Sequence, residues 1–200
     1  MKYDNFSIQY IEECEFDNHT AFKMRHKIYC EQYGFLPIAK NGMEIDEYDT
    51  EEGPALTAVI RSQGTGASVA VVRIIPAKVS RRLPFDTFEP GIATARHWGE
   101  VSRIGIDRGF KGTSESRKEL LVYLFKAVYQ VSLDLGVSHW VCMMPTALQL
   151  RMAMLGVTFE AVGEPVDYHG LRQPCVGVAH RILSSLEVDN PEMYKFIINR

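Results

Sequence analysis

The clearest hydrophobic pattern in the chain is an apolar stripe at helical spacing. Five residues repeat every three or four positions: Leu121, Leu124, Val128, Val131 and Leu135. Such spacing places all of them on one face of an α-helix. Ser116 and Glu119 fit a capping box at its start, and Gly136 fits its end. The pattern therefore predicts a helix over residues 116–135.

Short apolar runs predict the strands of a sheet. We expect strands at residues 6–11, 55–61, 68–75, 98–107, 139–143, 158–162 and 175–183. Further helices are predicted at residues 18–33, with Asn18 as N-cap and Gly34 as stop, from Pro145 to Gly156, and at residues 191–200. Residues 35–54 read as a loop with short helical pieces, and residues 76–97 as a long connection.

No repeat, low-complexity stretch or long linker interrupts this order, so we expect a single domain over residues 1–200. The order of elements predicts an α/β (α+β) fold. Its mixed, mainly antiparallel central sheet would carry helices on both faces.

Two arginines fall on apolar faces of their predicted elements. Arg25 shares a helical stripe with Phe22, Ile28 and Tyr29, and Arg73 is flanked by aliphatic residues on its strand face. A buried guanidinium is costly unless carboxylates or carbonyls pair with it. We therefore expect acidic partners. A purely structural ion network and a functional site both remain open at this point.

Candidate partners lie three residues apart in two segments. Asp46 and Asp49 would face one side of a helical turn, whereas Glu100 and Arg103 fall on a predicted strand. Regular pleating would put Glu100 and Arg103 on opposite faces, so a shared site requires a bulge. Five charged residues are predicted to converge in space: Arg25, Asp46, Asp49, Arg73 and Arg103.

Composition narrows the range of functions. The formal net charge of −3 gives no reason to expect a nucleic acid partner. Cysteines at positions 14, 30, 142 and 175 form no CxxC pair or zinc pattern, so no metal is expected. No signal peptide is visible, and the apolar run at residues 120–125 is too short to span a bilayer. We therefore expect a cytoplasmic protein with reduced thiols and no transmembrane segment.

The charged residues belong to a series of short motifs. They are Arg25-x-x-x-Tyr29-Cys30-Glu31, Gly34-Phe35, Glu44-x-Asp46-x-Tyr48-Asp49, Arg73-Ile-Ile-Pro76, Leu83-Pro84-Phe85, Glu100-Val-Ser-Arg103 and residues 163–174. This series resembles the PEP-CTERM/exosortase system-associated acyltransferases. It is also similar, more sparsely, to the acyl-homoserine-lactone (autoinducer) synthases and the N-acyl amino acid synthases. The resemblance implies a GNAT-type fold with a splayed or bulged catalytic strand.

The resemblance also implies an activity. A fatty acyl group would pass from a carrier thioester, on acyl-carrier protein phosphopantetheine or on coenzyme A, to the amine of a small acceptor. That acceptor would be an amino acid or S-adenosylmethionine, and no cofactor would be tightly bound. Glu100 would act as base, directly or through a water, unless it forms only a salt bridge with Arg103. Ser102 would bind the acceptor or support Glu100, and the strand around Ile104 would offer a backbone N–H to the carbonyl oxygen.

The implied substrate-binding residues are Arg25, Tyr29, Phe35, Asp46, Asp49, Arg73, Phe85, Trp140 and Met143. Phe88, Met144, Met152 and Met154 are further candidates for an acyl tunnel, with ordinary core packing as the alternative. Three residues of the late polar loop would contact the acceptor, with a solvated turn as the alternative: Tyr168, His169 and Arg172.

Two features depart from the resemblance. Autoinducer synthases usually carry a Trp near the position of Phe35. GNAT acetyltransferases bind the coenzyme A pyrophosphate on a glycine-rich turn, where this chain has Ser114 and Ser116. The implied donor-binding residues are Ile104, Lys111, Gly112, Ser114 and Ser116. The poorer turn favours acyl-carrier protein as donor.

Basic residues before and after the catalytic strand would attract an acidic carrier protein: Arg81, Arg82, Arg108, Lys111, Arg117 and Lys118. A merely solvated surface is the alternative. Two other functions stay open at this stage. One is an acetyl-CoA-dependent GNAT acetyltransferase, and the other is a non-catalytic module that senses acyl-carrier protein or lipid.

Overall fold

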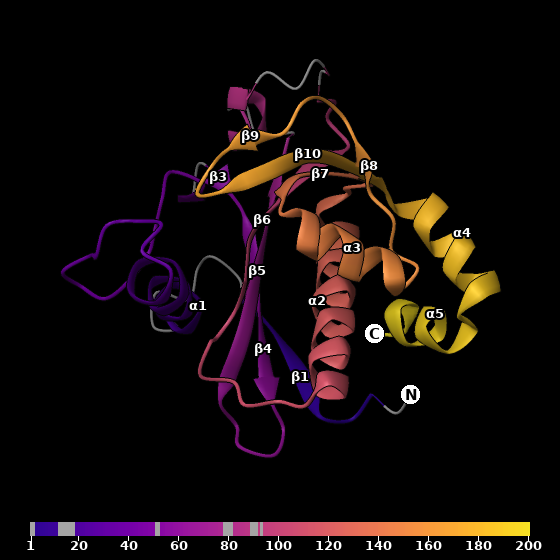
Figure 1. The fold of residues 1–200 in the computed structure, drawn as a ribbon, viewed down its shortest axis with the longest axis horizontal. Coiled ribbons are helices and arrows are strands. Elements are labelled where there is room, and N and C mark those ends of the chain that lie inside the picture. Colours follow the sequence, from indigo (N-terminus) through magenta and orange to yellow (C-terminus); the bar gives the residue numbers. More distant parts are fainter. Residues whose placement is uncertain (1–2, 12–18, 51–52, 78–81, 89–91, 93) are drawn as a thin grey trace.

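The computed structural model describes residues 3–11, 19–50, 53–77, 82–88, 92 and 94–200. Within these residues, eight strands form one sheet in the order β1-β4-β5-β6-β7-β10-β8, with β9 paired to β10 (Figure 1). Their bounds are Phe6–Ile11 (β1), Leu56–Ser62 (β4), Ser68–Pro76 (β5), Trp98–Ile106 (β6), His139–Met144 (β7), Glu160–Ala161 (β8), Val166–Asp167 (β9) and Leu171–Val178 (β10). The β6–β7 pair is parallel and the other pairs are antiparallel, so the predicted mixed sheet is confirmed. A separate short pair joins β2 (Asp49–Thr50) to β3 (Gly53–Pro54).

Helices cover both faces of the sheet (Figure 1). On one face, α1 (Thr20–Arg25) runs directly into η1 (His26–Gln32), a π-helical segment. On the other face lie α2 (Ser114–Leu135), α3 (Thr146–Met154), α4 (Ala179–Asp189) and α5 (Pro191–Ile198). The apolar stripe of α2 packs on the sheet in the main core, and α1 with η1 closes a smaller core against β4 and β5. This sandwich buries both faces of the central strands.

Several local predictions are confirmed and others are corrected. The hairpin of β4 and β5 and the stop of α2 at Gly136 agree with the sequence. The predicted capping box is wrong, because the side chain of Thr113 caps the N–H of Ser116, while Glu119 is buried and accepts hydrogen bonds from Asn5. The short helical pieces predicted for residues 35–54 are not found among the described residues. The N-cap proposed for Asn18 lies outside the described residues.

The last predicted strand is also wrong in its extent. β10 begins earlier than residue 175 and ends at Val178, and the chain then turns into α4. The apolar positions Ile182 and Leu186 of α4 are four apart and both buried. A short apolar run alone does not separate a strand from a buried helix. For this reason the sequence pattern alone does not separate α4 from the end of β10.

β6 carries the bulge that the spacing of Glu100 and Arg103 required. Arg73 of β5 lies opposite Ser102, but Val71 lies opposite Gly105, so β6 has one extra residue here. Arg103 takes a φ of 51°, which is uncommon for a residue with a side chain. The bulge turns Arg103 toward the same site as Glu100. A cavity therefore forms on this strand.

β6 and β7 also diverge along their length. Their ladder runs from Trp98 opposite His139 to Glu100 opposite Val141, although β6 continues to Ile106. Parallel neighbours that separate in this way leave a gap in the middle of the sheet. At Gly105 of β6, the absence of a side chain lets η1 approach closely, since an added Cβ would lie 2.9 Å from a methyl carbon of Ile28.

Candidate active site

A cavity of about 440 Å³ lies where β6 separates from β7. Its walls come from η1 and the loop after it, from the 3₁₀ segment η2 (Pro84–Phe88), from β6 and β7, and from residues 168–172. The residues named from the sequence that line it are Tyr29, Phe35, Phe88, Glu100, Ser102, Arg103, Ile104, Met143, Met144, Tyr168, His169 and Arg172. Its volume is within the range of small-molecule sites.

Three arginines and three carboxylates form a buried network beside this cavity. Arg25 donates two hydrogen bonds to Asp49, each 2.8 Å long, and a further one to Glu44. Arg73 donates to Asp46 at 2.7 Å and to Asp49 at 3.1 Å. Arg25 and Arg73 are fully buried.

Arg103 completes the network from the bulge of β6. Its guanidinium donates to Glu44 at 3.0 Å and to Asp46 at 3.1 Å. The predicted convergence of the five charged residues is therefore confirmed, and Glu44 joins them as the sixth member. Glu44 lies in the acidic run that supplied the two aspartates, and its burial is what the sequence pattern did not reveal.

The network fixes the loop of residues 44–49 against α1, β5 and β6. Burial alone would raise the pKa of Asp49, but its hydrogen bonds to Arg25 and the charges of Arg25 and Arg73 hold it well below its usual range. Burial likewise opposes ionisation of Glu44, and the charge of Arg25 lowers its pKa. These carboxylates remain charged at neutral pH, so the network is a set of paired ions.

Glu100 differs from these carboxylates because it lacks an arginine partner among the described residues. Its side chain is buried and accepts a 2.7 Å hydrogen bond from the backbone N–H of Phe85 in η2. Burial raises the pKa of Glu100 to about 7, against the opposing effects of the Phe85 hydrogen bond and of Arg73. The salt bridge between Glu100 and Arg103, considered as an alternative, is not formed here. A carboxyl that titrates near neutral pH is suited to general-base work.

Ser102 and Tyr29 connect the cavity wall to its surroundings. Ser102 Oγ accepts a 3.0 Å hydrogen bond from Nε of Arg73, so the buried network holds this hydroxyl in place. Tyr29 donates from its hydroxyl to the carbonyl oxygen of Ile104 at 2.6 Å. π-Helical segments are often found at functional sites, and η1 here directs Tyr29 into the wall.

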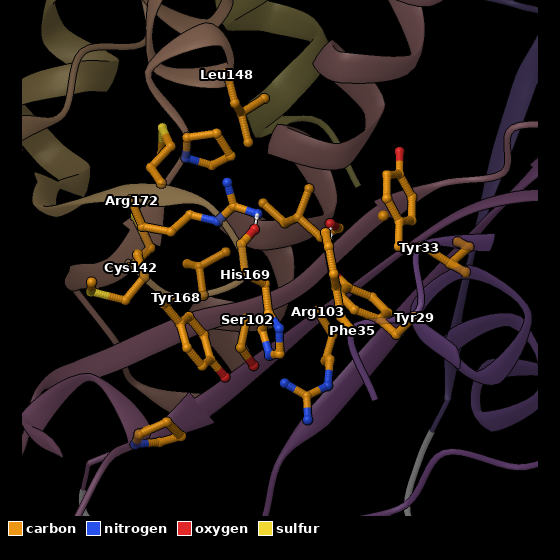
Figure 2. Close-up of a pocket in the computed structure, with 18 of the residues that line it drawn as sticks. Tyr29, Tyr33, Phe35, Ser102, Arg103, Cys142, Leu148, Tyr168, His169 and Arg172 are labelled. Atoms are coloured by element: carbon orange, nitrogen blue, oxygen red, sulfur yellow. Dashed lines mark hydrogen bonds between the residues drawn. The ribbon is translucent and has the colours of Figure 1, made fainter. Parts of the chain in front are cut away.

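Aromatic side chains close one end of the cavity. Phe35 stacks on His169 with ring centroids 5.0 Å apart and on Tyr33 at 5.1 Å. The ring of Phe88 packs against the ring of Tyr168, with the two ring centroids 4.9 Å apart. Figure 2 shows Tyr168, His169 and Arg172 on one side and Phe35 with Tyr29 on the other, although they are far apart in sequence.

Some residues named from the sequence lie elsewhere. Phe85 and Trp140 are fully buried in core clusters, and the indole N–H of Trp140 donates to Ser132. Met154 is 78% exposed on α3. For these three side chains, the assignment to a substrate wall is corrected, because packing or solvent surrounds them instead. Four of the predicted substrate-binding residues lie behind the wall rather than in it: Arg25, Asp46, Asp49 and Arg73.

The proposed donor turn lies outside the cavity wall, except for Ile104. Lys111, Gly112, Ser114 and Ser116 lie before and within the first turn of α2. The N–H of Ser116 is already taken by the side chain of Thr113 at 3.2 Å, which leaves less of the helix N-terminus for an anion.

A narrow apolar space extends the cavity toward α2. It has a volume of about 30 Å³ and shares six wall residues with the main cavity: Val101, Ile104, Leu121, Cys142, Met144 and Leu148. Its far wall includes Leu124, Val128 and Met152. Cys142 and Leu148 were not named as wall residues from the sequence. The position of Leu148 near the start of the predicted helix from Pro145 could have suggested it as a wall residue. Nothing in the sequence around Cys142 distinguished this residue from the core.

Among the described residues, no group of three or more His, Cys, Asp or Glu side chains is arranged to hold a metal ion. No helix in the described part of the chain is long and apolar enough to cross a membrane. Cys30, Cys142 and Cys175 are buried free thiols, and Cys14 lies outside the described residues.

Comparison with known proteins gives related matches. The family model described as N-acyl amino acid synthase FeeM matches residues 20–181. An acyl-homoserine-lactone synthase of Vibrio anguillarum is 23% identical over 150 residues, which are 72% of this chain and 76% of that protein.

Solved structures share the fold. The CoA-dependent acyl-homoserine lactone synthase BjaI, with SAM and isopentyl-CoA, has a TM-score of 0.70 at 20% identity, covering 96% of this chain and 89% of that one. FeeM, an N-acyl amino acid synthase from uncultured soil microbes, has a TM-score of 0.62 at 15% identity, covering 90% and 94%. The predicted relation to autoinducer and N-acyl amino acid synthases is confirmed. These matches give no support to the PEP-CTERM/exosortase link.

Proposed function

Because the chain belongs to the N-acyl amino acid synthase FeeM family, and is thus an acyltransferase, we propose that it transfers a fatty acyl group from acyl-carrier protein to the amine of a small acceptor. Glu100 carries this proposal. It is a buried carboxyl with a pKa raised to about 7, and it lines a cavity that continues into an apolar space. Amine, thioester and base can meet in that cavity.

The reaction needs one proton to be moved at the amine. The amine nitrogen attacks the thioester carbonyl and forms a C–N bond, and the ionised Glu100 takes the proton that the nitrogen loses. Collapse of the tetrahedral intermediate breaks the C–S bond and expels the thiolate of the carrier, which takes the proton from Glu100 and becomes a thiol, so that Glu100 is ionised again. The bulge at Arg103 and Ile104 interrupts the ladder to β5, and we assign a backbone N–H of this segment to the carbonyl oxygen.

The size of the cavity supports an acyl group longer than acetyl. The main cavity has a volume of about 440 Å³, and the apolar space of about 30 Å³ adds room for about one methylene at its end. The side chains around this space, from Val101 to Val128, are apolar, and each methylene that leaves water for such surroundings contributes about 0.8 kcal/mol. An acetyl group would leave most of the cavity unused, so we favour a longer acyl donor over acetyl-CoA.

The charge of the surface near the predicted donor turn supports acyl-carrier protein as the acyl donor. Arg108, Lys111, Arg117 and Lys118 are all exposed and lie on or just before the first turns of α2. Arg82 is exposed as well, and Arg81 lies outside the described residues. Acyl-carrier proteins are acidic, so this basic surface would speed their encounter in a salt-dependent way. The structural relative BjaI is described as CoA-dependent, which makes coenzyme A the competing donor.

The experiment supplies one acyl chain on carrier protein and on coenzyme A, at low and high salt, with a mixture of amino acids and S-adenosylmethionine as acceptors. Mass spectrometry identifies the acylated product. We expect turnover from the carrier protein that falls with salt, and loss of most turnover in Glu100→Gln. Equal efficiency with both donors, or faster turnover with acetyl-CoA, would refute the donor assignment. Near-normal kinetics of Glu100→Gln would move the base role to another group.

A further inference from the structure

The carboxyl of Glu100 is fixed by the 3₁₀ segment η2, which also forms part of the cavity wall. Its Oε2 accepts the 2.7 Å hydrogen bond from the backbone N–H of Phe85, and both residues are buried. A backbone N–H that is held in place orients the carboxyl to which it donates. The direction in which the other oxygen of Glu100 faces therefore depends on where η2 places the N–H of Phe85.

Asp86 closes the turn from which this N–H is donated. Its Oδ2 accepts a 3.0 Å hydrogen bond from the backbone N–H of Leu83, and its own N–H donates to the carbonyl oxygen of Leu83 at 3.0 Å. The first of these bonds is one half of a capping box, in which the side chain of the third helical residue reaches back to the residue before the helix. Leu83 and Asp86 are thus joined twice, and Phe85 lies between them.

Other contacts anchor the segment around Asp86. Thr94 donates a 3.5 Å hydrogen bond to the same carboxylate oxygen, and the guanidinium of Arg82 donates to the backbone carbonyl oxygen of Asp86. The ring of Phe85 is fully buried in a core cluster and fixes the place of η2 on the sheet. The turn that Asp86 closes then sets the direction of the Phe85 N–H.

Asp86 also acts on Glu100 through its charge. Burial is the largest cause of the raised pKa of Glu100, the hydrogen bond from Phe85 lowers this pKa, and the negative charge of Asp86 raises it. Asp86 thus has two opposite effects on one pKa, the first through the hydrogen bond that its turn holds and the second through its charge. A substitution that removes only the charge can therefore be told apart from one that removes both.

We propose that Asp86 is a positioning residue for the base: it holds the turn of η2 so that the Phe85 N–H fixes Glu100 with one oxygen directed to the amine. The inference rests on the proposed function of Glu100, and it adds the residue that orients this carboxyl. Proton transfer in the transition state depends on such alignment. The Leu83-Pro84-Phe85 motif then serves the reaction through its backbone, while the ring of Phe85 belongs to the core.

The test follows the titration of Glu100 directly, by NMR of protein with isotope-labelled glutamate carboxyls, and Glu100→Gln assigns the signal. Asp86→Asn keeps an oxygen for the Leu83 N–H but loses the charge, so its midpoint should lie below that of wild type. Asp86→Ala loses both. Its midpoint should lie about one pH unit above that of Asp86→Asn, because the Phe85 hydrogen bond is no longer held.

The same proteins are assayed for acyl transfer between about pH 5.5 and about pH 9. We expect kcat of Asp86→Ala to fall about 10-fold with little change in KM, and Asp86→Asn to restore most of this loss. Asp86→Ser has a hydroxyl one bond too short for the Leu83 N–H, and it replaces Asp86→Ala if that protein does not fold. The control is Asp189→Ala, exposed on α4, which should change neither the midpoint nor kcat.

The inference and the proposed function fail in different ways. Equal Glu100 midpoints in Asp86→Asn and Asp86→Ala would refute the positioning role, and a lower kcat of Asp86→Ala would then reflect a structural role alone. Midpoints in the expected order, with a pH profile of kcat that does not follow them, would keep the positioning of Glu100 and refute Glu100 as the base.

Discussion

Glu100→Gln is predicted to make the protein more stable at high pH while it loses activity. The pKa of Glu100 is raised from 4.5 to about 7 by burial. Below the pKa of Glu100 in the unfolded state, the carboxyl is protonated in both the folded and the unfolded protein, so it does not change the free energy of unfolding. As pH rises toward 7, the unfolded state releases its proton first, so the folded state loses stability until its own carboxyl ionises. A pKa shift of this size lowers the free energy of unfolding by about 3 kcal/mol once the pH is above 7.

Glutamine cannot ionise, and its amide oxygen can still accept the hydrogen bond from Phe85. The free energy of unfolding of the variant should therefore lack the pH dependence that comes from Glu100. The other titratable groups are the same in both proteins, so their effects cancel when the two free energies are subtracted. Urea unfolding of both proteins at about pH 5 and about pH 8.5 gives the four free energies that are needed. We expect most of the difference of about 3 kcal/mol to appear between these two values.

Glu187→Gln is the matched control, because Glu187 is exposed on α4. It should show no such pH-dependent gain. A Glu100→Gln protein whose stability relative to wild type is the same at both pH values would contradict the raised pKa. The reasoning about the base would then fail too, because kcat/KM of the wild type is expected to rise with pH through the same value near 7.

Two further predictions concern the network and the acyl space. Arg25→Gln should lower the free energy of unfolding by about 3–5 kcal/mol, because it leaves buried carboxylates uncompensated, whereas Lys27→Gln, which breaks the half-exposed pair with Asp107, should cost about 1 kcal/mol or less. Urea unfolding near neutral pH checks both, and equal losses would contradict the buried network. Val128→Leu narrows the apolar space, so competition between acyl donors of different length should show a shift to shorter chains, and an unchanged preference would exclude this space as the acyl site.

The sequence alone determined most of the elements that build the fold. The stripe of α2, the β4–β5 hairpin and β6 follow from local periodicity and from turn residues, which act over a few positions. The inward-facing arginines also required acidic partners, because an unpaired guanidinium cannot be buried cheaply. The convergence of Arg25, Arg73 and Arg103 with the aspartates could be predicted for that reason.

The sequence was less informative where local patterns are ambiguous. The sequence pattern predicts Ser116 as the cap of α2, whereas the side chain of Thr113 caps this helix. α4 and the end of β10 were merged, because short apolar runs suit a strand and a buried helix equally. Phe85, Trp140 and Met143 are all large apolar residues, and only packing shows that Met143 faces the cavity while the other two lie in the core.

Only the tertiary structure decided the properties of the site. Glu100 and Asp49 are both buried carboxyls in short motifs, yet their pKa values move in opposite directions. Asp49 lies between two guanidinium groups, whereas Glu100 meets a backbone N–H, and these partners come from distant parts of the chain. The place of Arg172 in the cavity wall likewise depends on how the β9–β10 hairpin folds over the cavity. Charge pairing and desolvation depend on neighbours in space, so the sequence names the groups and the fold sets their chemistry.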